Sequence, residues 1–155
     1  MTSDRAVITL TRYGEPTDLV CETLASLTRL DAEGLRVHVC DQRADPGLAR
    51  EVARRATDRL PMRCETIPAR SLSYARNHAL DAAGSPIVLY LDPDALVATD
   101  WATQMLAAFE EDPDAVIVGA RILPRWHGSP PLLARARFVR DQYSLIDLGK
   151  DRQPY

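Results

Sequence analysis

Short apolar runs alternate with amphipathic segments along most of this chain, and the alternation predicts strands and helices in turn. Apolar runs rich in β-branched residues predict strands at residues 6–11, 35–40, 62–67, 86–91 and 115–123. Between these runs apolar residues recur at helical spacing, as at Val20, Leu24 and Leu27. We therefore expect five strands separated by helices.

Capping residues predict where several of these helices begin and end. Asp45 followed by Pro46 is typical of an N-cap with proline at the first helical position. Ser71 or Ser73 is the expected cap of the next helix, which should end at Gly84. The strand predicted after that helix, PIVLYL, is continuously apolar. This favours a central parallel strand that is covered on both faces.

Strands that alternate with helices are typical of an α/β domain with three layers, in which helices cover both faces of a mostly parallel sheet. In open sheets of this kind, ligands bind beyond the carboxyl ends of the strands, near the point where the strand order reverses. Asp41, and the pair Asp92 and Asp94, each follow a predicted strand directly. We therefore expect these three carboxylates to share one edge of the sheet.

Composition narrows the class of protein. The 155 residues suffice for one folded domain, and hydrophobic and charged fractions of 46% and 26% are ordinary for such a domain. The formal charge of −3 does not favour general nucleic-acid binding. We find no apolar run near the roughly 20 residues of a membrane span and no signal-peptide pattern at the N-terminus. With three cysteines and no CxxC pair, the chain is expected to be cytoplasmic with buried, reduced thiols.

The candidate metal site is Asp92-Pro93-Asp94. Two carboxylates two residues apart, on a turn stiffened by proline, can direct their oxygens toward one point. Hard cations such as Mn²⁺ or Mg²⁺ prefer oxygen ligands, and two protein carboxylates leave positions open for the oxygens of a diphosphate. The alternative for so short a motif is a solvated turn without a ligand.

Other side chains near this edge could hold the rest of a nucleotide-like ligand. Arg76 lies in the first turns of a helix opened by serine, where free N–H groups and the helix dipole favour an anion. Asp41 could accept a hydrogen bond from the imide N–H of uracil. Thr11, Arg12 and Tyr13 end the first predicted strand, where a hydroxyl or a ring could contact base or ribose. A surface salt bridge for Arg76 and a turn role for Asp41 are the alternatives.

The order of these motifs resembles the N-terminal portion of family 2 glycosyltransferases, which are inverting enzymes with a GT-A fold. The resemblance covers residues 6–126 and rests, in chain order, on VITLT, VHVCDQ, SLSYARN, VLYLDPD, DW and VGARILPRW. The sequence ARN followed by a strand and then DPD carries more weight than any single motif.

The resemblance implies a Rossmann-like GT-A sheet in residues 1–126 that binds a nucleotide sugar, with a UDP-sugar as the expected donor. Within it Thr11 and Asp41 would line the nucleobase pocket, and Arg76 would lie beside the diphosphate. Asp92 would contact the ribose or the metal, and Asp94 would bind the metal directly.

Family members continue with an acceptor-binding half, which includes the acidic motif that supplies the catalytic base. Residues 127–155 are expected to be a helix and loop that begin that half. Asp141 and Asp147 are the carboxylates between the last predicted strand and Lys150, and neither is expected to be the base. The base and the acceptor are therefore unknown, and we expect this chain to be incomplete as a catalyst.

Two other functions remain open. A non-catalytic module could bind a nucleotide sugar or dock onto a partner through the arginine-rich stretch 121–140, and as an open half-domain with exposed apolar surface it would form homodimers. A nucleotidyltransferase of similar architecture usually has a glycine-rich loop with a basic residue after the first strand. Here only Gly14 lies in that loop, which disfavours this class.

Overall fold

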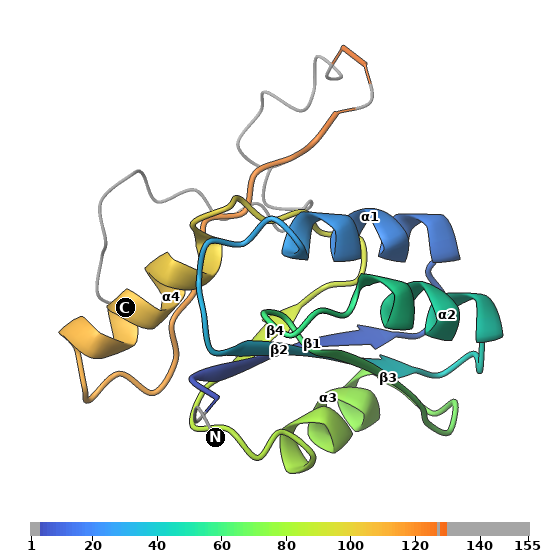
Figure 1. Ribbon diagram of the computed structural model, residues 1–155, viewed down its shortest axis with the longest axis horizontal. Coiled ribbons are helices and arrows are strands. Elements are labelled where there is room, and N and C mark those ends of the chain that lie inside the picture. The colour runs from blue at the N-terminus through green and yellow to red at the C-terminus, as the bar shows by residue number, and fades with distance from the viewer. Residues whose placement is uncertain (1–3, 127, 130–155) are drawn as a thin grey trace. The chain divides into compact units, whose positions relative to one another are not determined.

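The computed structural model describes residues 4–126 and 128–129 of the chain (Figure 1). Strands and helices alternate along them in the order β1 (Ala6–Arg12), α1 (Thr17–Leu27), β2 (Leu35–Asp41), α2 (Pro46–Arg55), β3 (Met62–Thr66), α3 (Leu72–Asp81), β4 (Val88–Leu91) and α4 (Trp101–Glu111). The chain divides into two compact units, Met1–Gln104 and Met105–Tyr155. All four strands and the first three helices belong to the first unit, which is considered by itself below.

Within the described residues, four parallel strands form one sheet in the order β3-β2-β1-β4. Arg12 pairs with Asp41, and Asp41 pairs with Thr66, so β1, β2 and β3 end at the same level. The chain moves outward from β1 to β3 and then returns to the free side of β1. The strand order therefore reverses between β1 and β4, and the predicted α/β fold with a parallel sheet is confirmed.

Helices cover both faces of this sheet (Figure 1). Helices α1 and α2 lie side by side on one face, and α3 lies on the other. Crossovers between parallel strands are right-handed, so the reversal of direction after β3 carries α3 to the opposite face. The small side chains of Ala75 and Ala79 allow α3 to pack closely against Cys40 and Ile67. The interior side chains of the other face are almost completely buried and include Ile8, Leu10, Val20, Leu24, Val37, Val39, Leu48 and Val52.

The predicted caps of two helices are confirmed. Asp45 caps α2, because its carboxylate accepts the N–H of Gly47 at 2.8 Å, and Pro46 stands at the first helical position. Ser71, rather than Ser73, caps α3 and accepts the N–H of Tyr74 at 3.1 Å. Each cap satisfies an N–H group that has no partner inside its helix.

Two predictions about strands are wrong. Residues 115–123 do not form a fifth strand, and the side chains of Val116 and Ile117 are 89% and 88% exposed. A strand needs a partner strand for its N–H and C=O groups. Among the described residues, only β1, β2, β3 and β4 are paired in a sheet. Strand β4 is not central either, because in the described sheet it pairs with β1 alone and Tyr90 is exposed. Apolar composition does not reveal whether a run has a partner strand on each side.

All three cysteines are free thiols; the predicted burial is confirmed for Cys40 but is wrong for Cys21 and Cys64, which are half-buried. Burial raises the pKa of the Cys40 thiol to about 12 and that of Cys64 to about 11. Such thiols carry almost no thiolate near neutral pH and are therefore unreactive. None of the helices among the described residues is long and apolar enough to cross a membrane.

Candidate functional site

The loop after β4 is held on its inner side and open to solvent on its outer side. The N–H of Ala95 donates to the carbonyl of Asp92 at 3.1 Å and closes a turn around Pro93. Pro93 is buried, whereas Asp92 and Asp94 are exposed. Since Leu91 pairs with Leu10 near the end of β1, both carboxylates lie at the carboxyl edge of the sheet.

Arg76 reaches this turn from α3. Its guanidinium donates to Oδ1 of Asp92 at 3.0 Å, and both side chains are accessible to solvent. The hydroxyl of Tyr90 on β4 donates to the carbonyl of Arg76 at 3.1 Å, which connects α3 to the edge strand. The fold thus brings a cation from α3 to Asp92, the first of the two carboxylates that follow β4.

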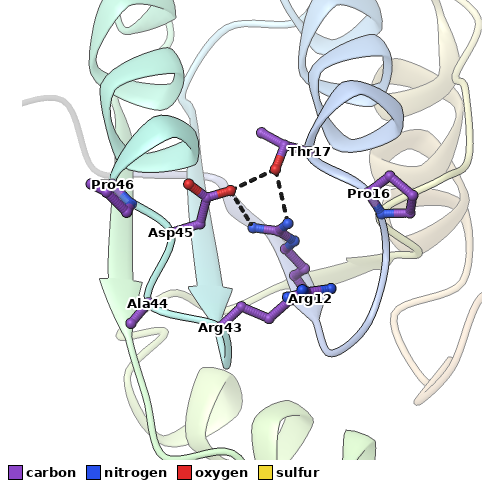
Figure 2. Close-up of a pocket in the computed structure, with 7 residues that line it drawn as sticks. All are labelled: Arg12, Pro16, Thr17, Arg43, Ala44, Asp45 and Pro46. Atoms are coloured by element: carbon purple, nitrogen blue, oxygen red, sulfur yellow. Dashed lines mark hydrogen bonds and ion pairs between the residues drawn. The ribbon is translucent and has the colours of Figure 1, made fainter.

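Arg12, at the end of β1, lies inside a separate polar network rather than at the surface (Figure 2). Its side chain is 3% exposed, and the guanidinium donates to Oδ2 of Asp45 at 3.1 Å and to the hydroxyl of Thr17 at 2.9 Å. A third bond, to the carbonyl of Glu15, measures 2.8 Å. Thr17 also donates to Oδ2 of Asp45 at 2.5 Å. The network joins the first turns of α1 and α2, and Arg12 is therefore not placed to contact a base.

A hollow of about 530 Å³ lies over this network, between the N-terminal ends of α1 and α2 (Figure 2). Its lining residues are Arg12, Pro16, Thr17, Arg43, Ala44, Asp45 and Pro46. The charged groups of Arg12 and Asp45 are already bonded to each other. Hydrogen bonds from Thr17, from the N–H of Gly47 and from Arg12, in that order, lower the pKa of Asp45. None of the predicted site residues Thr11, Tyr13 and Asp41 lines the hollow, so we do not assign the ligand to it.

Asp41 and Thr11 are both buried near the carboxyl edge but belong to opposite faces of the sheet. Oδ1 of Asp41 accepts the N–H of Arg43 at 3.0 Å, and Oδ2 accepts that of Asp45 at 2.7 Å. Thr11 pairs with Cys40, whose side chain packs with α3. Because neighbouring residues of a strand point to opposite faces, the structure does not bring the two side chains together. A nucleobase contact by either one stays a prediction.

Tyr13 extends from the end of β1 with 54% of its side chain exposed. Glu15 holds the backbone of Tyr13 and Gly14, because its Oε2 accepts their N–H groups at 2.9 Å and 3.0 Å. Burial alone would raise the pKa of Glu15, but hydrogen bonds from backbone N–H groups lower it. An exposed ring on a fixed backbone is able to stack on a planar ligand, so a contact with base or ribose stays a prediction for Tyr13.

Sequence reasoning missed two hydroxyl groups of α1 that contact the loop after β4. Thr23 donates to the carbonyl of Pro93 at 2.9 Å, and Oγ of Ser26 accepts the N–H of Val97 at 3.3 Å. Both side chains are buried among the apolar residues with which α1 faces the sheet. That position was the available signal, since a buried hydroxyl on an apolar helix face needs a hydrogen-bond partner.

Asp92 and Asp94 offer carboxylate oxygens, the type of ligand that a hard divalent cation prefers, but two residues do not form a complete set of ligands. The described residues contain no group of three or more His, Cys, Asp or Glu side chains that could hold a metal ion. Two exposed carboxylates leave the other positions of Mn²⁺ or Mg²⁺ to water and to oxygens of a ligand, as is common where a cation binds with phosphates. The donor set therefore fits a cation that binds together with an anionic ligand.

Comparison with solved structures identifies the fold. A mannosyltransferase from Pyrobaculum calidifontis, solved with GDP-Man and Mn²⁺, is 28% identical to this chain, with a TM-score of 0.60. The match covers 79% of this chain and 36% of the mannosyltransferase chain. S. aureus TarS 1–349, solved with UDP-GlcNAc, is 20% identical to this chain, with a TM-score of 0.59. The match covers 78% of this chain and 37% of the TarS chain. The second likeness shows the fold only. The sheet is thus that of the GT-A glycosyltransferases.

Comparison of sequences identifies the family. A glucosyl-dolichyl phosphate glucuronosyltransferase of Haloferax volcanii is 32% identical over 62 residues, which make up 40% of this chain and 20% of that protein. The chain thus spans about a fifth of this curated relative and just over a third of the two solved chains. The model of the family described as glycosyl transferase family 2 matches residues 7–151. Because that match extends over nearly the whole chain, the chain belongs to glycosyl transferase family 2.

Proposed function

We propose that this chain binds a nucleoside diphosphate sugar and a divalent cation at the carboxyl edge of its sheet, as the donor-binding part of an inverting glycosyltransferase. The observation that carries the proposal is the meeting of Arg76 from α3 with the turn that bears Asp92 and Asp94. This meeting lies at the reversal of strand order, where open α/β sheets bind their ligands. Membership of the family and the Pyrobaculum neighbour, whose structure holds GDP-Man and Mn²⁺, support the same assignment.

Three side chains have distinct parts in this proposal. Arg76 would exchange its bond to Asp92 for diphosphate oxygens, which a planar guanidinium can contact through two N–H groups at once. Asp94, which is exposed, would bind the cation, and Asp92 would bind the cation or the ribose. A cation held there would offset the negative charge that builds up on the departing nucleoside diphosphate.

The proposal covers the electrophilic half of the reaction. In an inverting transfer the acceptor oxygen attacks the anomeric carbon while the bond to the diphosphate breaks, and a base within about 3 Å takes the hydroxyl proton. The electron pair of the broken bond leaves with the diphosphate, which Arg76 would stabilise by hydrogen bonds. No described residue is assigned as the base, and the acceptor is not identified.

Calorimetric titration of UDP and of GDP, with and without Mn²⁺, tests this proposal. We expect UDP to bind more tightly with Mn²⁺ present, and Asp94→Ala to weaken the Mn²⁺-dependent binding by about tenfold or more, because one of two protein oxygen ligands is removed. GDP is included because the Pyrobaculum neighbour was solved with GDP-Man.

The control is Asp58→Ala, which removes an exposed carboxylate just before β3, at the opposite edge of the sheet. This variant should bind as the parent does. Equal Mn²⁺-dependent binding by parent and Asp94→Ala would contradict the metal role. If neither nucleotide bound to the parent, the non-catalytic docking module would become the better explanation.

A further inference from the structure

Two buried hydroxyls of α1 hold the loop that carries the candidate metal ligands. Thr23 is 0% exposed and donates to the carbonyl of Pro93 at 2.9 Å. Ser26 is 1% exposed and accepts the N–H of Val97 at 3.3 Å, while its own proton is donated to the carbonyl of Thr23 at 2.7 Å. The loop is thus bonded to α1 on either side of Asp94, by residues about 70 positions away in the sequence.

The first of these bonds has a particular consequence because the acceptor belongs to a proline. Pro93 has no N–H, so its carbonyl is the only backbone group with which it can form a hydrogen bond. The residue is buried, and a buried carbonyl without a donor costs about 1–3 kcal/mol. Thr23 is the donor, and the bond directs the Pro93 carbonyl toward α1. The carboxylates on both sides of Pro93 are exposed on the outer side of the turn.

The simpler explanation is that these hydroxyls only bond to their own helix, as serine and threonine often do. Thr23 does lie 3.4 Å from the carbonyl of Leu19. However, a hydroxyl has one proton, and the bond to Pro93 is shorter by half an ångström than this distance. The hydroxyl of Ser26 donates to a carbonyl of its own helix and also accepts the N–H of Val97 from the loop. Bonding within the helix therefore does not use the full hydrogen-bonding capacity of this hydroxyl.

We propose that Thr23 is a positioning residue for the metal-binding turn: its hydroxyl fixes the Pro93 carbonyl and thereby orients the carboxylate of Asp94 toward the cation and the diphosphate. This inference rests on the proposed donor site. Thr23 touches neither the ligand nor the cation and acts through the backbone of the turn. Ser26, which holds Val97, limits movement of the same loop at its far end.

The test compares Thr23→Val, which keeps the shape and loses the hydroxyl, with Thr23→Ser, which keeps the donor. We expect Thr23→Val to weaken Mn²⁺-dependent UDP binding by about fivefold, the effect of one hydrogen bond, and Thr23→Ser to restore most of it. Nucleotide binding measured without Mn²⁺ should change less than Mn²⁺-dependent binding, because without the cation the carboxylate of Asp94 has no ligand to hold. A purely structural role would lower both affinities together.

Thr28→Val is the matched control, since Thr28 ends the same helix and, among the described residues, its exposed hydroxyl bonds to the carbonyl of Ala25 in its own helix. Should Thr23→Val fail to fold, Ser26→Ala tests the second attachment and should weaken Mn²⁺-dependent binding more than metal-free binding. Parent-like Mn²⁺-dependent binding in the folded variant would overturn the inference and leave the donor site standing. A parent chain that binds no nucleotide would overturn the donor site and the inference with it.

Discussion

Arg12 occupies the point where β1, β2 and the first turns of α1 and α2 meet. The sequence placed this residue, with Thr11 and Tyr13, at the end of the first predicted strand, where a contact with base or ribose was expected. The structure instead buries its guanidinium against Asp45 and Thr17, with Asp41 at 3.5 Å. A charged group can be buried in this way only when several acceptors surround it, and three separate segments supply them.

We expect Arg12→Lys to lower the free energy of unfolding by about 3 kcal/mol, because one ammonium group cannot reach the acceptors that the guanidinium spans. Urea unfolding measures the change. Arg43→Lys is the matched control, since Arg43 is exposed and its guanidinium donates to the carbonyl of Gly14 at the surface, and its effect should stay within about 0.5 kcal/mol. Equal stabilities of the two variants would show that the buried network contributes little.

At the scale of elements, a carboxylate bridge joins α3 to the sheet. Oε2 of Glu65 on β3 lies 2.9 Å from Nε2 of His38 on β2, and Oε1 lies 2.9 Å from Nε2 of His78 on α3. Arg63 approaches Nδ1 of His38 at 3.2 Å. A guanidinium can only donate, so Nδ1 must accept, and His38 is neutral with its proton on Nε2. The helix that carries Arg76 is thus fixed to two strands.

This bridge predicts that the free energy of unfolding falls as the pH is lowered from 8 to 5. Burial, and then the charge of Arg63, lower the pKa of His38 below its ordinary value of 6.5. A group with a lowered pKa binds more protons in the unfolded chain, so its contribution to stability is complete above pH 6.5 and declines below it. Urea unfolding at pH 8, 6 and 5 measures how the free energy of unfolding changes with pH.

Glu65 and a pair of variants complete this experiment. Burial alone would raise the pKa of Glu65, but hydrogen bonds from His78 and His38 lower it, so its contribution is lost only below its ordinary pKa of 4.5. His38→Gln should therefore reduce the dependence of the free energy of unfolding on pH between pH 8 and 5. His78→Gln, which retains the buried His38, should keep most of that dependence. A slope that is unchanged in His38→Gln would assign the pH dependence to other groups.

The elements also show where prediction from sequence succeeded and failed. The starts of α2 and α3 followed from Asp45 and Ser71, because capping depends on residues a few positions apart. The prediction of a strand at residues 115–123 was wrong, although the apolar pattern of this segment is at least as strong as that of β3. Pairing with a neighbour decides whether such a run becomes a strand, and that neighbour lies far away in the sequence.

At the scale of the whole sheet, the thiol of Cys40 should report unfolding. It is buried between β2 and α3, and burial followed by the nearby charge of Glu65 raises its pKa to about 12. In a chain carrying Cys21→Ser and Cys64→Ser, we expect a disulfide reagent to label Cys40 only through unfolding, so that the rate rises with urea as global unfolding does. The labelling reaction is stopped at successive times, and mass spectrometry of the labelled fraction gives the rate.

The comparison chain for this experiment keeps Cys21 alone. Cys21 lies half-buried on α1, so it should react faster and depend less on urea. If Cys40 were labelled as fast as Cys21 and without dependence on urea, α3 would have to open locally. The packing of α3 against the sheet would then be weaker than the structure indicates.

The alternation of strands and helices, two of the caps and the position of Asp92 and Asp94 after a strand all follow from residues near one another in the chain. These features could be predicted because periodicity, capping and turn chemistry act over a few residues. The same local order of motifs also carried the resemblance to family 2 glycosyltransferases, which the family match over residues 7–151 confirms.

Contacts between distant segments decided the rest. Only the folded chain shows that β4 lies beside β1, that Arg12 points into a buried network, and that Thr23 bonds to a proline about 70 residues away. A polar residue in a sequence indicates that a partner is needed without naming it, because the partner is set by the order of strands and the faces on which the helices pack. The geometry around the turn of Asp92 and Asp94 is therefore a property of the tertiary structure.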